Sequence, residues 1–354
     1  MVVHGRDPFN AEPPRTALAH DPLTPVDTFY VRNHGPVPGL DLADWRLAVS
    51  GLVAYPLRLS MEQLRDDFES RRMVVTLQCA GNRRAGLHAV KAIPGEAPWG
   101  PGATGTAEWE GVRLSDVLKA AGIEDHAHHV EFIGADVSAE ASPPQAFGAS
   151  ISRRKALAGE VLLAWAMNGR PLPPVHGAPL RVIVPGYIGA RSVKWLERIV
   201  ARTTSSENFF QSRTYRLLPP DLPAAAALDG AGVALGAVAV NCDFLVPHDG
   251  ARVTAGSLQL GGYAFAGDER HIVRVDVSAD GGGSWRQAEL LDAPSRWAWR
   301  RWRARIEVTA GETEIVARAW DSAATTQPAD PAELWNAKGY ANNAWARLRV
   351  TVTD

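Results

Sequence analysis

The stretch Met73-Val-Val-Thr-Leu-Gln-Cys79-Ala-Gly-Asn-Arg83-Arg84 contains a short strand and the turn that ends it. Residues 73–77 are apolar or β-branched, which is typical of a strand buried inside a sheet. Ala-Gly-Asn then predicts a turn, and two arginines follow it. A thiol at the end of a rigid strand, near two guanidinium groups, is expected to have a stabilised thiolate. The stretch is compatible with a reactive or metal-binding Cys79, and also with a small, packed apolar cysteine.

Composition limits the kind of protein that this chain can be. Cys79 and Cys242 are the only cysteines among 354 residues, which excludes a disulfide scaffold and zinc or iron–sulfur sites built from cysteine clusters. The 37 Lys and Arg residues nearly balance the 39 Asp and Glu residues, so there is no basic excess for nucleic acid. The most apolar stretch, residues 231–240, is about half as long as a membrane helix, and the first residues contain no apolar signal segment. We expect a soluble, cytoplasmic protein without nucleic-acid or membrane partners.

The first part of the chain mixes strands and helices without a regular alternation. Residues 1–45 form a proline-rich segment that predicts an extended arm. Helices are expected at Ser60–Phe68, where Ser60 can cap the N-terminus, at Arg113–Gly122 and around Arg153–Leu157. A second buried strand is expected at Leu180–Val184. This pattern favours an α+β domain.

The composition changes at residues 217–227, where prolines and then alanines predict a linker. Beyond it, apolar and polar residues alternate at residues 273–278 and 302–308, and Gly-rich turns separate the strands. We therefore expect an all-β, immunoglobulin-like sandwich. The predicted domains are residues 1–220 and 221–354. The tryptophans between Trp285 and Trp345 fit either internal packing or an interface with a partner subunit.

Three short segments gather cationic and hydrogen-bonding side chains. In Phe29–Pro38, Arg32 and His34 are two residues apart in an extended segment, so both should point to the same face. Residues 175–181 pair a second histidine with a second arginine, and residues 191–194 add two more cations. Each segment alone fits a solvated surface. Together with Cys79 they would suit a phosphorylated cofactor or an oxyanion substrate.

These segments resemble the sulfite oxidase family of molybdenum enzymes. The resemblance covers nearly the whole chain and implies a mixed α/β molybdopterin domain followed by an immunoglobulin-like domain, through which the protein would form a homodimer. The motifs that carry it are Phe29–Pro38, Gln78–Arg84, Met167-Asn-Gly-Arg-Pro-Leu-Pro-Pro-Val-His-Gly177, Val184–Leu196 and Asn342-Asn-Ala-Trp-Ala-Arg347.

The resemblance also implies roles for individual residues. Cys79 would be the thiolate ligand to molybdenum. The substrate site would contain Arg32, Arg84, Trp99, Tyr215 and Lys338. The residues that would hold molybdopterin are Tyr30, Val31, Arg32, Asn33, His34, Asp136, His176, Arg181, Ser192, Val193 and Lys194.

The activity that the resemblance implies is molybdenum-dependent oxidation of sulfite to sulfate by oxo transfer. Electrons would pass to an external acceptor, either oxygen or a cytochrome. We expect no haem, because the arm before Arg32 is too short to form a haem domain. One alternative is related molybdenum chemistry on another small oxyanion or a sulfoxide, such as nitrate reduction. The other is a non-catalytic cofactor-binding or interaction protein.

One position departs from the family pattern. Animal and plant sulfite oxidases have Arg in a Trp-Asn-Leu-Arg-Gly segment, and this chain has Trp335-Asn-Ala-Lys338-Gly. Lysine keeps the positive charge but loses the planar, bidentate fork, so weaker or differently tuned sulfite affinity is expected. The related nitrate reductases typically have Met here. A cation at position 338, together with Tyr215, therefore favours sulfite over nitrate.

Overall fold

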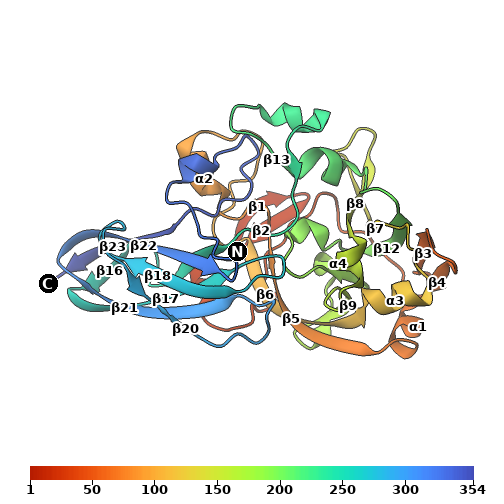
Figure 1. The fold of residues 1–354 in the computed structure, drawn as a ribbon, viewed down its shortest axis with the longest axis horizontal. Helices are drawn as coiled ribbons and strands as arrows, with labels where there is room; N and C mark the ends of the chain where they lie inside the picture. The colour runs from red at the N-terminus through yellow and green to blue at the C-terminus, as the bar shows by residue number, and fades with distance from the viewer.

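The computed structural model describes residues 1–354, and its two halves lie side by side along the long axis (Figure 1). The N-terminal half contains two five-stranded sheets. The strands β5 (Ser70–Gln78), β6 (Thr104–Arg113), β9 (Leu162–Met167) and β10 (Arg170–Pro171) form the first in the order β10-β9-β6-β5, and β11 (Arg181–Ile183) pairs with β9. The second has the order β4-β3-β12-β7-β8, with β3 (Leu47–Gly51), β4 (Leu57–Leu59), β7 (His129–Ser138), β8 (Gln145–Ser152) and β12 (Leu196–Arg202). The predicted mixed domain is confirmed.

The helices of this half are short. The three that the sequence predicts are confirmed as α1 (Met61–Asp66), α3 (Leu114–Ala120) and α4 (Arg153–Leu157). Ser60 begins α1 with a capping box, and Gly122 follows α3 at φ +64°. The sequence gives no sign of α2 (Arg84–Val90), which starts directly after the turn that follows Cys79.

Two sheets form the C-terminal half. One has the order β15-β17-β21-β20, made of β15 (Asn241–Val246), β17 (Gly256–Phe265), β20 (Glu289–Leu290) and β21 (Arg300–Val308). The other has the order β16-β23-β22-β18-β19, made of β16 (Ala251–Thr254), β18 (Ile272–Ser278), β19 (Arg286–Gln287), β22 (Gly311–Asp321) and β23 (Ala346–Thr353). Phe244 and Trp302 from the first sheet and Ile315 and Leu348 from the second share one buried core. This half is all-β, as predicted, and its immunoglobulin-like type stays a prediction.

The tryptophans of the C-terminal half divide into two groups. Trp297, Trp299 and Trp302 are buried, so packing accounts for them. The other four, Trp285, Trp320, Trp335 and Trp345, are half-buried. The guanidinium carbon of Arg318 lies 3.7 Å, 4.6 Å and 5.5 Å from the ring centres of Trp285, Trp320 and Trp345. A role for the half-buried tryptophans in a subunit interface stays a prediction.

The two halves are packed against each other. Leu245, Tyr263 and Trp299 from the C-terminal half belong to the main apolar core of the N-terminal half. The segment predicted as a linker holds β13 (Arg216–Leu217), which pairs with β14 (Val233–Ala234), and a 3₁₀ helix over Ala224–Asp229. The domain boundary between residues 220 and 221 stays a prediction. The N-terminal arm begins with a hairpin of β1 (Val2–Arg6) and β2 (Phe9–Glu12), which sequence reasoning missed.

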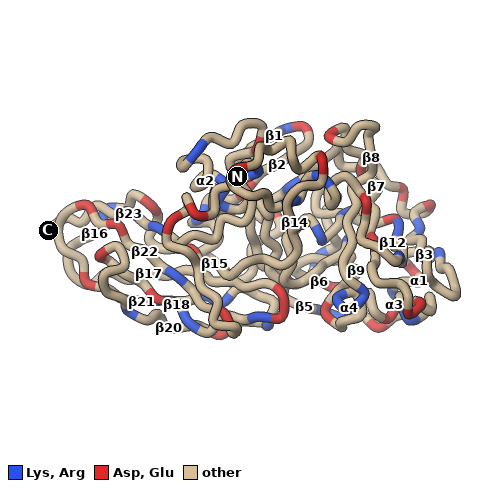
Figure 2. The backbone as a smooth tube through the Cα atoms, turned by 45° about the horizontal axis from the view of Figure 1, so that its top comes forward, with Lys and Arg blue, Asp and Glu red and all other residues tan.

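Charges of both signs are interspersed along the backbone of both halves (Figure 2). This matches the formal net charge of -2. None of the helices combines the length and the hydrophobicity needed to cross a lipid bilayer.

Candidate functional site

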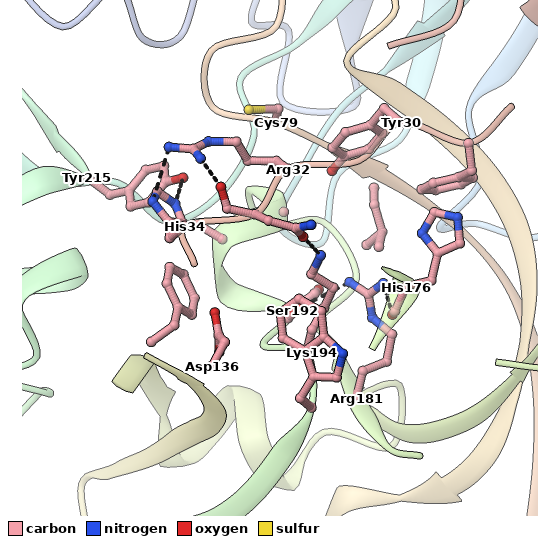
Figure 3. Close-up of a pocket in the computed structure, with 17 residues that line it drawn as sticks. Tyr30, Arg32, His34, Cys79, Asp136, His176, Arg181, Ser192, Lys194 and Tyr215 are labelled. Carbon is pink, nitrogen blue, oxygen red and sulfur yellow. Dashed lines mark hydrogen bonds between the residues drawn. The ribbon is translucent and has the colours of Figure 1, made fainter. Parts of the chain in front are cut away.

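A cleft opens in the N-terminal half, with Cys79 near one end and a group of cations at the other (Figure 3). Its lining comes from strand ends and loops that are far apart in the sequence. The predicted site residues that line it are Tyr30, Arg32, Asn33, His34, Cys79, Asp136, His176, Arg181, Ser192, Lys194 and Tyr215. The structure therefore brings together most of the residues that the sequence motifs single out.

Arg181 and Lys194 lie at the end of the cleft away from Cys79 (Figure 3). Arg181 donates from Nη1 to His176 O (2.8 Å) and from Nη2 to Ser192 O (3.1 Å). Burial lowers the pKa of Arg181 to about 10, and burial, with the Arg181 charge, lowers the pKa of Lys194 well below its usual value. Burial also raises the pKa of Asp136, the nearby carboxyl group, to about 6. A buried and a half-buried cation with so little compensating charge are suited to an anion such as a phosphate.

Glycines permit the close approach of the backbone segments around the cleft. Gly177 has φ +109°, and a Cβ atom there would lie 2.8 Å from Cβ of Lys194. A Cβ atom on Gly189 would lie 2.4 Å from the hydroxyl oxygen of Tyr30. These two positions explain why the motifs that carry the cations also carry glycines.

Arg32 and His34 point to the same side, as the extended segment predicts, with 3.1 Å between Arg32 Nη2 and His34 Nδ1. His34 Nδ1 also lies 2.9 Å from Glu140 Oε1, and His34 Nε2 lies 2.8 Å from the hydroxyl of Tyr215. A single π-helical turn over Phe210–Thr214 ends at Tyr215, and such turns are frequent at functional sites. The result is a continuous polar chain from a partly exposed carboxylate to a buried phenol.

Cys79 follows β5 directly, and its sulfur accepts a hydrogen bond from Gly81 N at 3.4 Å. Arg84 lies against Gly81, because a Cβ atom on that glycine would come within 2.8 Å of the Arg84 guanidinium carbon. Burial raises the pKa of Cys79, and the positive charges of Arg84 and Arg32 only partly oppose it. This corrects the expectation of a thiolate stabilised by both arginines. Arg83 points away and donates to backbone oxygens of the C-terminal half.

Five predicted residues lie beside the cleft and not in its lining. Val31 and Val193 are held by backbone hydrogen bonds that position the segments on which they lie. Trp99 is buried in the apolar cluster that also contains Cys79. Arg84 and Lys338 sit next to that cluster and share a carboxylate partner.

Sequence reasoning missed three residues around Cys79. Glu96 is the shared partner of Arg84 and Lys338, and Glu140 contacts His34 and Arg32. The ring of Tyr340 stacks on that of Tyr215 with 5.4 Å between ring centres. Tyr340 could have been found, because it comes two residues after Lys338 in the same motif. Nothing in the sequence around the two glutamates marks them.

The two cleft histidines predict how stability depends on pH. Burial lowers the pKa of His34 and of His176 from 6.5 to about 4. Because each ring binds protons more readily in the unfolded chain, the free energy of unfolding of the cofactor-free protein should fall as the pH drops from about 6.5 to 4. At pH 5 each histidine should contribute a loss of about 2 kcal/mol, to order of magnitude.

Thermal melts of cofactor-free protein between pH 7 and pH 5 would measure this loss. The variant His176→Gln should lose less stability over that range than the wild type. His126, whose side chain is 60% exposed, provides the control variant His126→Gln, which should follow the wild type. Equal pH dependence in the wild type and in His176→Gln would contradict the prediction.

Two protein-family models together match most of the chain. The oxidoreductase molybdopterin binding domain matches residues 34–210, and the Mo-co oxidoreductase dimerisation domain matches residues 234–353. Among solved structures, the chain is similar to the sulfane dehydrogenase SoxCD from Paracoccus pantotrophus. The two are 28% identical with a TM-score of 0.82, and the match covers 97% of this chain and 84% of that one.

Curated relatives include enzymes named for two different substrates. The chain is 41% identical to a sulfite oxidase from Gallus gallus, over 98% of this chain and 77% of that protein. It is 40% identical to a nitrate reductase from Spinacia oleracea, over 98% of this chain and 40% of that protein. The chain spans about two thirds of the length of the mammalian sulfite oxidases that it also matches. Overall identity therefore does not distinguish between the two substrates.

Proposed function

The chain belongs to the sulfite oxidase family of molybdenum oxidoreductases, and we propose that, with molybdopterin bound, it oxidises sulfite to sulfate. The observation that supports this most strongly is that one cleft has Cys79 and Arg32 on one side and the cations Arg181 and Lys194 on the other. A site for a phosphorylated cofactor and a site for a small anion thus adjoin each other.

The residues of the cleft fit molybdopterin. Several buried polar atoms in its lining have no hydrogen-bond partner within the protein, among them Asn33 Nδ2, Asp136 Oδ1 and Arg181 Nε. We assign the phosphate to Arg181, Lys194 and their neighbours, and the polar edge of the pterin to Asn33 and Asp136. Cys79 would bind the metal. When bound, the cofactor supplies oxygen-atom transfer and accepts the electron pair from the substrate.

The protein's own contribution is to hold a small dianion and to exclude other substrates. Arg32 lies beside Tyr215, and we propose that the guanidinium and the phenol position the oxygens of sulfite. Burial raises the pKa of Tyr215, so its hydroxyl stays protonated. His34 Nε2 lies 2.8 Å from that hydroxyl, and this hydrogen bond fixes the direction of the phenol.

Nitrate is the alternative substrate, and a direct comparison tests the choice. Lys338 supports sulfite, because sulfite carries more negative charge than nitrate and gains more from an added cation. Molybdenum-loaded protein should reduce ferricyanide when sulfite is added, and it should show no comparable oxidation of a reduced dye when nitrate is added. Turnover with nitrate alone would overturn the proposal.

Lys338→Arg should lower the KM for sulfite severalfold. A guanidinium can contact Glu96 and still present a second pair of N–H donors to the substrate, whereas an ammonium concentrates its charge at one atom. Steady-state kinetics with sulfite would measure the change. Lys91→Arg is a suitable control, because the Lys91 ammonium lies over the Trp335 ring, 4.3 Å from its centre. An unchanged KM in Lys338→Arg would contradict the assigned role.

We propose further that the protein is a homodimer, with the C-terminal half as the interface, and that electrons pass to an external acceptor, either oxygen or a cytochrome. The match of residues 234–353 to a dimerisation domain supports the first point. A clean monomer in sedimentation at micromolar concentration would contradict it. The expected lack of haem and the cytoplasmic location stay predictions, which a visible absorption spectrum and cell fractionation would test.

A further inference from the structure

Glu96 occupies an unusual position between the two cations next to Cys79. It lies in the loop between α2 and β6, with Oε1 on Lys338 Nζ and Oε2 3.3 Å from Arg84 Nη2. All three side chains are largely buried, with exposures of 18% for Glu96, 15% for Lys338 and 4% for Arg84. The carboxylate is therefore a fixed part of the site and not a passing surface contact.

The Nε and Nη1 atoms of Arg84 also have partners. Its Nη1 donates to Ala97 O (2.9 Å), and its Nε donates to Lys338 O (3.1 Å) and Gly339 O (3.3 Å). The Glu96 carboxylate thus takes up an N–H group of Arg84 that an anion could otherwise contact. The same carboxylate takes the ion pair of Lys338.

The charge around Cys79 is consequently lower than its cations suggest. Arg32, Arg84 and Lys338 supply three positive charges. Glu96 and Glu140 supply two negative ones, and the buried Glu12, whose charge also acts on Cys79, supplies a third, so the formal charges cancel. A substrate dianion entering this region gains less attraction than it would from three free cations. Glu96 and Glu140 differ in burial, because the Glu140 side chain is 41% exposed and that of Glu96 is 18% exposed. The field of Glu96 is therefore less screened by solvent.

Building on the proposed oxidation of sulfite, we propose that Glu96 is an internal competitor for the substrate anion and sets its affinity. Glu96 holds Lys338 and Arg84 when no anion is present, and a dianion must share these cations with it or displace it. The product dianion meets the same competition, so the carboxylate also favours release of sulfate. Glu96 acts through Lys338 and Arg84 and is a positioning residue.

The test uses Glu96→Gln in molybdenum-loaded protein, because glutamine keeps the shape and removes the charge, while its one carbonyl oxygen still accepts a hydrogen bond from one of the two cations. The Kd for sulfate, measured by calorimetry without turnover, should fall by about fivefold to tenfold, as should the KM for sulfite. The increase in kcat/KM should come from KM, with kcat no higher than in the wild type. An unchanged or higher sulfate Kd would overturn the proposal.

Two further variants separate charge from structure. Glu96→Asp keeps the charge, so it should retain a sulfate Kd close to that of the wild type. If it tightens sulfate binding as much as Glu96→Gln does, the loop geometry and not the charge is responsible, and the proposal fails. Glu160→Gln is the matched control, because Glu160 forms a similarly buried pair with Lys155 at 2.7 Å outside the cleft. It should leave the sulfate Kd unchanged.

The two proposals fail in different ways. A loaded wild type that binds sulfate but does not oxidise sulfite would overturn the proposed function. The sulfate Kd of Glu96→Gln would still decide whether Glu96 competes for an anion at this site.

Discussion

Cys79→Ser should reduce sulfite-dependent turnover of the cofactor-loaded protein by at least about a hundredfold, equivalent to about 2.7 kcal/mol of transition-state stabilisation. Cys79 provides the one sulfur atom in the lining of the cleft and follows β5 directly. Burial raises its pKa, and the positive charges of Arg84 and Arg32 reduce that increase. Serine has nearly the same size but offers an oxygen that ionises far less readily. The loss should therefore come from the metal bond and not from the packing.

The control for this variant is Cys242→Ser. Cys242 is also buried, and burial raises its pKa to about 12, but it belongs to the core of the C-terminal half. Turnover per bound molybdenum should be unchanged there. The metal content of both variants has to be measured, so that turnover is compared per loaded site. Equal activity of Cys79→Ser and the wild type would remove Cys79 from the metal site.

Lys194→Met should stabilise the cofactor-free protein and weaken its binding of the cofactor. Burial and the nearby Arg181 lower the pKa of Lys194, so holding its charge in the folded chain opposes folding when no anion is bound. Methionine removes that charge, and the melting temperature of the cofactor-free protein should rise by about 2 °C or more. Cofactor content after expression in a host that makes molybdopterin should fall by at least about tenfold, because a phosphate contact is lost.

Lys155→Met provides a control of opposite sign. Lys155 is buried and is paired with Glu160 at 2.7 Å, so its removal leaves a carboxylate without its partner. This variant should lower the melting temperature and leave cofactor content per folded protein unchanged. Should Lys194→Met destabilise the cofactor-free protein and keep its cofactor, the assignment of Lys194 to an anion site would be wrong.

Local patterns predicted much of the fold. Ser60 and Gly122 marked helix ends that the structure confirms, because capping depends on a few neighbouring residues. The strand before Cys79 and the alternation beyond residue 273 were likewise local signals. The α2 helix was missed, since it starts from Arg83 in a left-handed conformation that is held by contacts with the C-terminal half.

Site residues could be predicted where one segment contains both the cation and the backbone pattern that orients it. Arg32 and His34 met as expected because alternation in an extended segment fixes their common face. Glu96 and Glu140 could not be found in the same way, because each meets its partners only through folding of distant segments. The raised pKa of Cys79 could not be predicted either, because burial depends on the whole fold. Its effect outweighs the positive charges of Arg84 and Arg32.

The most direct test of the central claim is the stoichiometry of sulfite oxidation by fully molybdenum-loaded protein. Ferricyanide accepts electrons without a specific docking partner, so the natural acceptor does not have to be known. We expect one sulfate to form for every two ferricyanide ions reduced, with the rate saturating in sulfite. A fully loaded protein that reduces no ferricyanide when sulfite is added would contradict it.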